Sequence, residues 1–237
     1  MASDVDKLFE LLDRWRHLPN YQLERRADIF FGLYLPELLA DRYEQPIAGV
    51  VPEFPVKRDL IWPSHPTNKS VKVDYVAFAD DRTRCYFVEL KTDVASRRDA
   101  QDHYLERCGE LGLAAILDGL TSIVKASSAH QKYFHLLSKL AELGCLDLPP
   151  ELAELVFPQA RPGLRKLQDQ IEICVDPGEF ELEVVYIQPL VLEDGSDNVI
   201  GFEEMASWLD GKDEMARVFA QYLRRWTRPA GALRVDV

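Results

Sequence analysis

The stretch that decides the fold is VKVDYVAFADDRTRCYFVELK, residues 71–91. Its two halves alternate and are rich in β-branched and aromatic residues, which is typical of strands, and the polar run between them is typical of a turn. We therefore predict two antiparallel strands joined by a tight loop around Asp81 and Arg82. In the register that such a loop sets, Val76 faces Phe87 across the hairpin.

The same register places Asp74 opposite Glu89, and alternation puts Lys91 on the same, largely apolar face. Two facing carboxylates repel one another unless a cation lies between them. Mg²⁺, or Mn²⁺ in its place, prefers oxygen ligands and is commonly held by one or two carboxylates plus substrate phosphate. We therefore expect Asp74, Glu89 and the backbone carbonyl of Leu90 to bind the ion, with Lys91 beside it.

Such a site suits the hydrolysis of a phosphodiester bond. The bound ion would lower the pKa of a water molecule and offset the charge that develops on the phosphate. Lys91 would orient the attacking water and add positive charge. The sequence thus predicts a catalytic set made of Asp74, Glu89 and Lys91.

The elements around the hairpin complete an α/β pattern. In chain order, the spacing of apolar residues and prolines predicts a helix over 3–15, a helix over 20–43 that kinks or breaks at Pro36, an edge strand over 49–56, a long helix after Asp93 to about 126, a strand over 181–190 and two C-terminal helices within 199–237. We expect a single domain over 1–237, with a helical insertion over 127–170.

Asp74 followed by Glu89-Leu90-Lys91, on a hairpin that a helix and a strand precede and a helix follows, resembles the PD-(D/E)XK nuclease superfamily. The resemblance covers roughly residues 20–126 and the strand 181–190. It implies a restriction-endonuclease-like fold, in which an αβββαβ core has a mixed central sheet flanked by helices, and metal-dependent cleavage of DNA, less often RNA. It makes the two acidic residues metal ligands and the lysine catalytic. Val73 stands where the motif has proline, which loosens the match.

The resemblance also suggests site residues outside the hairpin. Many members carry a glutamate on the first helix near the metal, and Glu24 is the candidate, with Glu37 as its rival. Some members carry a glutamine and a tyrosine on the helix after the lysine. Gln101 and Tyr104 match those positions approximately, and we expect them to contact substrate.

Arg97 and Arg98 lie at the predicted start of that helix. A helix N-terminus favours anions, and arginine pairs well with phosphate, so the two side chains are candidates for substrate binding. A solvated first turn of the helix would give the same pattern.

Composition limits the class of protein. The chain has 237 residues, 47% of them hydrophobic, with 28 Lys and Arg against 40 Asp and Glu, a net charge of −12. This charge argues against a protein that coats nucleic acid through its overall field. The sequence shows neither a long apolar run nor a signal-peptide pattern, so we expect no membrane partner and a cytoplasmic location.

Three function classes follow from these patterns. The first is a Mg²⁺-dependent nuclease acting on DNA, as a homodimer if it cuts both strands of a duplex. The second is a catalytically silent nuclease-fold protein that serves as a binding or assembly module, which the charge of −12 favours. The third is a largely helical interaction protein that uses the helices over 111–140 and the terminal helices as a partner surface.

Overall fold

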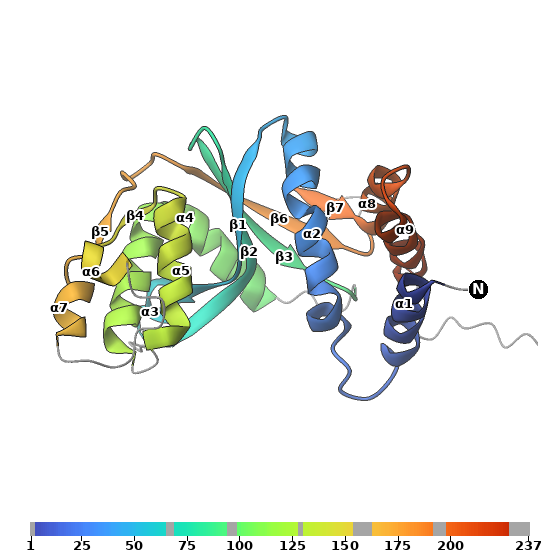
Figure 1. Cartoon of the computed structure of the whole chain (residues 1–237), viewed down its shortest axis with the longest axis horizontal. Coiled ribbons are helices and arrows are strands. Elements are labelled where there is room, and N and C mark those ends of the chain that lie inside the picture. The colour runs from blue at the N-terminus through green and yellow to red at the C-terminus, as the bar shows by residue number, and fades with distance from the viewer. Residues whose placement is uncertain are drawn as a thin grey trace, which may run out of the picture.

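The computed structural model describes residues 3–64, 69–93, 99–127, 130–153, 163–191 and 198–227. The chain forms an α/β fold in which a five-stranded mixed sheet is flanked by helices (Figure 1). This confirms the predicted α/β class and excludes a largely helical protein. No helix in the described ranges combines the length and apolarity needed to cross a lipid bilayer.

The secondary structure follows the predicted order, but the long helix expected up to about 126 is kinked at Gly112, whose φ of 75° is not helical. The helices are α1 (Asp4–Trp15), α2 (Leu23–Tyr43), α3 (Arg58–Ile61), α4 (Asp99–Ala126), α5 (His130–Glu142), α6 (Pro150–Ala153), α7 (Leu164–Gln168), α8 (Phe202–Leu209) and α9 (Glu214–Trp226). The strands are β1 (Ile47–Lys57), β2 (Ser70–Ala79), β3 (Arg84–Leu90), β4 (Leu146–Asp147), β5 (Glu172–Ile173), β6 (Glu181–Gln188) and β7 (Val199–Gly201).

The main sheet has the strand order β1-β2-β3-β6-β7. The β1–β2 and β2–β3 pairs are antiparallel, whereas β6 runs parallel to both β3 and β7. Val76 pairs with Phe87, which confirms the predicted hairpin register. The proline-containing strand β1 lies at the sheet edge, as predicted, because Pro52 and Pro55 donate no backbone hydrogen bond.

Alternation along the strands divides the core into two layers. Tyr86 and Val88 point to a face covered by α2, α8 and α9, whereas Cys85 and Phe87 point to a face covered by α4 and α5. Figure 1 shows these two groups of helices on opposite sides of the sheet. The site residues lie at one end of this double-sided core.

Three further expectations about the chain need correction. Helix α2 runs through Pro36 without a break, because buried leucines on both sides of it hold the two halves on the sheet. The segment expected to be a helical insertion also contains β4, which pairs with β5 in a separate two-stranded sheet. The C-terminal segment begins with β7, a strand too short for a sequence pattern, before its two predicted helices.

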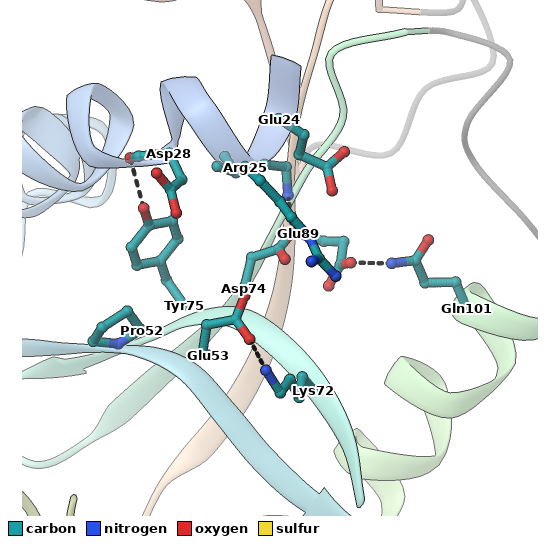
Figure 2. Close-up of a pocket in the computed structure, with 11 residues that line it drawn as sticks. Glu24, Arg25, Asp28, Pro52, Glu53, Lys72, Asp74, Tyr75, Glu89 and Gln101 are labelled. Atoms are coloured by element: carbon teal, nitrogen blue, oxygen red, sulfur yellow. Dashed lines mark hydrogen bonds and ion pairs between the residues drawn. The ribbon is translucent and has the colours of Figure 1, made fainter. Parts of the chain in front are cut away.

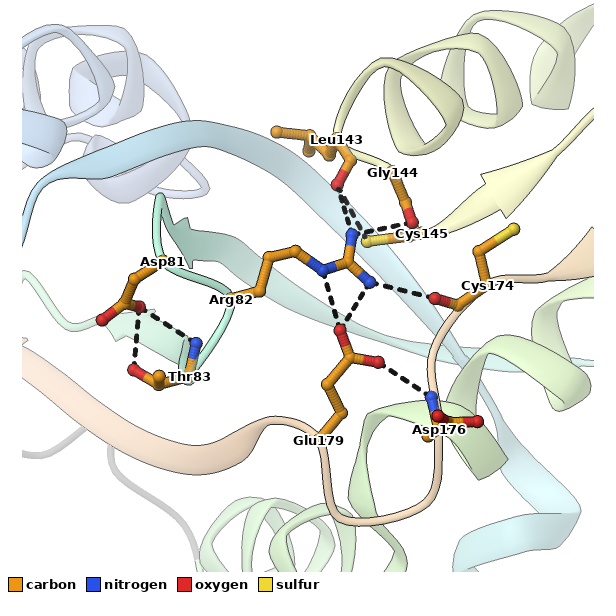
Figure 3. Close-up of polar contacts among 9 residues, drawn as sticks. All are labelled: Asp81, Arg82, Thr83, Leu143, Gly144, Cys145, Cys174, Asp176 and Glu179. Atoms are coloured by element: carbon orange, nitrogen blue, oxygen red, sulfur yellow. Dashed lines mark hydrogen bonds and ion pairs between the residues drawn. The ribbon is translucent and has the colours of Figure 1, made fainter.

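The turn of the β2–β3 hairpin is fastened to the rest of the molecule by Arg82 (Figure 3). Its Nε donates to Glu179 Oε1 at 2.7 Å, and its two terminal nitrogens donate to the carbonyl oxygens of Gly144 and Cys174, each at 2.9 Å. The backbone N–H of Asp176 donates to the other oxygen of Glu179. One side chain therefore joins the hairpin to the segments after α5 and before β6.

Candidate functional site

The opposite end of the hairpin borders a cavity of about 230 Å³ (Figure 2). Residues from α2, β1, β2, β3 and α4 line it. Glu24 comes from α2, Asp74 from β2, Glu89 from β3 and Gln101 from α4. Four segments that are separate in the sequence thus place acidic or amide groups around one space.

Asp74 lies where β2 and β3 separate. The last pair of the β2–β3 ladder is Tyr75 with Val88, so the expected Asp74–Glu89 position lies one step beyond it. There the backbone N–H of Leu90 donates to Asp74 Oδ2 at 2.8 Å. A side-chain carboxylate therefore takes the place of a ladder carbonyl, which fixes it beside the end of β3.

Glu89 is buried, with 2% of its surface exposed, and its carboxylate accepts three hydrogen bonds. Its Oε1 accepts hydrogen bonds from Lys91 Nζ at 3.1 Å and from Gln101 Nε2. Its Oε2 accepts one from the Tyr104 hydroxyl at 3.0 Å. Helix α4 thus holds the Glu89 side chain in one orientation.

Lys91 is equally buried, with 3% of its surface exposed. Besides Glu89, its ammonium donates to the backbone carbonyl oxygen of Leu90 at 2.7 Å. The backbone N–H of Lys91 donates to Ile187 O at 2.8 Å, so the chain continues beside β6 after β3 ends. A buried lysine is costly unless it is paired, and these contacts fix its position.

The electrostatics of the site are unfavourable to its carboxylates. Burial, and after it the negative charge of Asp74, raises the pKa of Glu89 to about 8. Burial also raises the pKa of Asp74, against the lowering effects of the Leu90 N–H and of Lys91. The pKa of Glu24 is raised by burial as well. Carboxylates with raised pKa values in one cavity are typical of functional sites.

The oxygen donors of the site fit a hard divalent cation. The carboxylates of Asp74 and Glu89 and the carbonyl of Leu90 are the ligand types that Mg²⁺ and Mn²⁺ prefer, and extra positive charge would relieve the repulsion between the two acids. In this structure the Lys91 ammonium contacts two of these groups, Glu89 Oε1 and Leu90 O. The described residues contain no group of three His, Cys, Asp or Glu side chains arranged to hold a metal.

The structure separates the two candidates for the additional glutamate. Glu24 lines the cavity, one helical turn before Asp28, which is also an α2 residue of the lining. Glu37 is an exposed residue further along α2, and it forms an ion pair with Lys212 at 2.9 Å. Glu24 is therefore the glutamate of α2 that the fold brings to the site.

Gln101 and Tyr104, predicted to contact substrate, both contact Glu89. Tyr104 is buried, and its hydroxyl also lies 3.2 Å from the backbone oxygen of Lys72. These contacts give the two residues a positioning role toward the Glu89 carboxylate. Arg97 and Arg98 lie outside the described residues.

Two cavity residues with positive charge were not predicted. Arg25 comes from α2, and Lys72 from β2, where it forms an ion pair with Glu53. Both could have been found by periodicity, because Lys72 shares the strand face of Asp74 and Arg25 lies three positions from Asp28. In the sequence alone, neither residue stands out from other charged residues on a helix or strand, and the cavity is what distinguishes them.

The site therefore combines a buried and a half-buried acidic group, a buried lysine, a backbone carbonyl and an adjoining cavity. The residues that line the cavity come from three neighbouring strands and from α2 and α4, which cover opposite faces of the sheet. No family model matches the chain, and comparison with curated proteins and with solved structures finds no significant match.

Proposed function

We propose that this chain is a metal-dependent nuclease that hydrolyses phosphodiester bonds of DNA. The observation that carries the proposal is the convergence of Asp74, Glu89 and Lys91 at one end of the hairpin, beside a cavity. Burying Glu89 and Lys91 with Asp74 half-buried beside them costs free energy, because each charge loses water contacts. Such an arrangement is typical of a site selected for chemistry.

The order of the elements supports the proposal. The sequence of α2, β1, β2, β3, α4 and β6 follows the αβββαβ order expected of a restriction-endonuclease-like core. The antiparallel β1–β2–β3 unit with β6 parallel to β3 gives the mixed sheet expected of that core. On this proposal, α1, α8 and α9 are additions that complete the layer beside α2.

The side chains divide the work of hydrolysis. When bound by Asp74, Glu89 and the Leu90 carbonyl, Mg²⁺ or Mn²⁺ would polarise the phosphate and lower the pKa of a water ligand. Gln101 and Tyr104 keep the Glu89 carboxylate in place through their hydrogen bonds. Lys91 would supply positive charge and hydrogen-bond donors that orient the attacking water.

Cleavage of labelled single-stranded and duplex DNA, with Mg²⁺, Mn²⁺ or EDTA, tests the proposal. We expect the parent to cut with either metal, and Glu89→Gln and Lys91→Ala to lose at least about a thousandfold in rate. Glu37→Gln is the matched control, because it neutralises an exposed glutamate of α2 outside the site. A parent that cuts neither substrate, and binds neither metal in calorimetry, contradicts the proposal.

The second candidate is a catalytically silent protein of the same fold. The contacts of Lys91 with Glu89 and the Leu90 carbonyl favour it, because they satisfy the site without a metal ion. The net charge of −12 also disfavours broad contact with nucleic acid. Calorimetry separates the two candidates, since the silent protein has no need to bind Mg²⁺ or Mn²⁺. Sedimentation with and without DNA tests whether a homodimer forms.

A further inference from the structure

The wall of the cavity carries positive charge on two sides, in addition to its acidic groups. Arg25 reaches the cavity from α2 and Lys72 from β2. Figure 2 shows the Arg25 side chain extending from the helix into the cavity, in the direction of Asp74 and Glu89. A polyanion bound at these carboxylates would therefore lie beside both cationic groups.

Arg25 differs from other arginines of the fold in how its guanidinium is used. Arg42, Arg82 and Arg224 each form an ion pair with a carboxylate. Within the described part of the chain, Arg25 makes no hydrogen bond or ion pair, although several acidic residues line the same cavity. No described residue accepts a hydrogen bond from the five N–H donors of Arg25, so these donors can bind a ligand.

Three of the carboxylates that line the cavity already have hydrogen-bond or ion-pair partners. Glu89 accepts three hydrogen bonds, Asp74 accepts the Leu90 N–H, and Glu53 is paired with Lys72. The Lys72–Glu53 pair is half exposed on both sides, and exposed pairs of this kind contribute little to stability. A phosphate can therefore compete for Lys72. Within the described residues Arg25 has no hydrogen bond or close ion pair to give up, and its attraction to Glu24 acts at longer range.

We propose that Arg25 binds a phosphate of the substrate strand next to the site of hydrolysis, with Lys72 as a second, exchangeable contact. The inference rests on the proposed nuclease function and adds a residue that binds the substrate. Planar guanidinium groups bind two phosphate oxygens at once, which lysine does not. Arg25 thereby offsets, at the cavity, the repulsion between an anionic strand and the surrounding carboxylates.

Kinetics with Mg²⁺ and labelled DNA test the inference in the full chain. We expect Arg25→Ala to raise KM about tenfold or more, with a smaller change in kcat, and Arg25→Lys to recover part of the loss. Removal of a phosphate contact also lowers the salt dependence, by about 0.7 in the slope of log(kcat/KM) against log of the salt concentration for a single strand. Arg26→Ala is the matched control, because Arg26 is exposed and adjacent but does not line the cavity.

Binding gives a readout that does not depend on turnover. In a Lys91→Ala background, which keeps the expected metal ligands, fluorescence anisotropy with Mg²⁺ should show Kd for labelled DNA rising about tenfold on adding Arg25→Ala. The inference would be overturned if the parent cuts DNA and Arg25→Ala leaves KM, Kd and the salt slope unchanged. An equal effect of Arg26→Ala would overturn it as well, since it would mean a diffuse field.

The failure of each proposal has its own signature. If the parent binds DNA without cutting it, and Arg25→Ala weakens that binding while Arg26→Ala does not, the phosphate contact stands and the proposed hydrolysis fails. If the parent cuts DNA and Arg25→Ala behaves like the parent, the hydrolysis stands and the contact fails.

Discussion

The two ends of the β2–β3 hairpin both gather charged side chains, with opposite results. At the turn, Arg82 donates to Glu179 and to backbone carbonyls, and the pKa of Glu179 is lowered by the Asp176 N–H and by Arg82. At the open end, burial raises the pKa values of both Asp74 and Glu89, and the negative charge of Asp74 raises that of Glu89 further. The surroundings of the first cluster favour its charged carboxylate, whereas burial in the second cluster disfavours the charged forms of its carboxylates.

This difference teaches how to separate structural from functional charge. The turn cluster is partly exposed, matches each charge with a partner and borders none of the cavity. The open end keeps two acids close together in a buried place, where apolar residues would cost less. Retaining such a cluster makes sense if a metal ion and a substrate complete it.

The largest expected effect contrasts activity with stability at the open end. Glu89→Gln should abolish cleavage while leaving the free energy of unfolding in EDTA unchanged or higher, because a neutral amide avoids burying a charge beside Asp74. Urea unfolding followed by circular dichroism, beside the cleavage assay, checks this. A loss of more than about 2 kcal/mol would instead mean that the Glu89–Lys91 pair stabilises the fold.

At the turn we expect a substitution to lower stability and to leave cleavage unchanged. Arg82→Met should lower the free energy of unfolding by about 2 to 3 kcal/mol, because it leaves the carbonyls of Gly144 and Cys174 without their donor, and it should leave the cleavage rate unchanged. Arg84→Met is the control on the same hairpin. The Arg84 side chain is about as exposed as that of Arg82 but pairs with the carboxylates of Glu181 and Glu183 and not with backbone carbonyls, so it should contribute less than about 1 kcal/mol. Equal losses in both variants would contradict the role given to Arg82.

A smaller effect tests the contact between Arg82 and the chain after α5. Gly144 has φ of +69°, and an added Cβ would lie 2.6 Å from Nη1 of Arg82. We expect Gly144→Ala to lower the free energy of unfolding by about 1 to 2 kcal/mol. Gly178→Ala, with φ of +84° and open space around it, measures the backbone cost alone. The extra cost at Gly144 should vanish in an Arg82→Met background.

The smallest effect is a pH dependence at the turn. The pKa of Glu179 in the folded chain lies below its usual 4.5, so its stabilising contribution is present above that value and is lost as pH falls through the folded pKa. Glu179→Gln should therefore be less stable than the parent at pH 7, and the gap should close at lower pH. Urea unfolding of both proteins at pH 7 and in acid measures it. A gap independent of pH would assign the effect to lost packing.

The sequence predicts the hairpin well because its information is local. Alternation and a short turn set the register of Val76 against Phe87, and the same alternation brings Asp74, Glu89 and Lys91 to one end. The prolines of β1 similarly predict an edge strand from the missing donors alone. The capping box of Ser3 and Asp6 sets the start of α1 in the same way.

Contacts between distant segments were decided by the tertiary structure alone. Helix α2 continues through Pro36 because the sheet holds both of its halves, and its position over the hairpin brings Glu24 and Arg25 to the cavity while Glu37 stays outside. Gln101 meets Glu89 only because α4 packs across the end of β3. A residue pattern repeats over a few positions and so fixes strands and helices, whereas the packing of whole elements decides which side chains share a site.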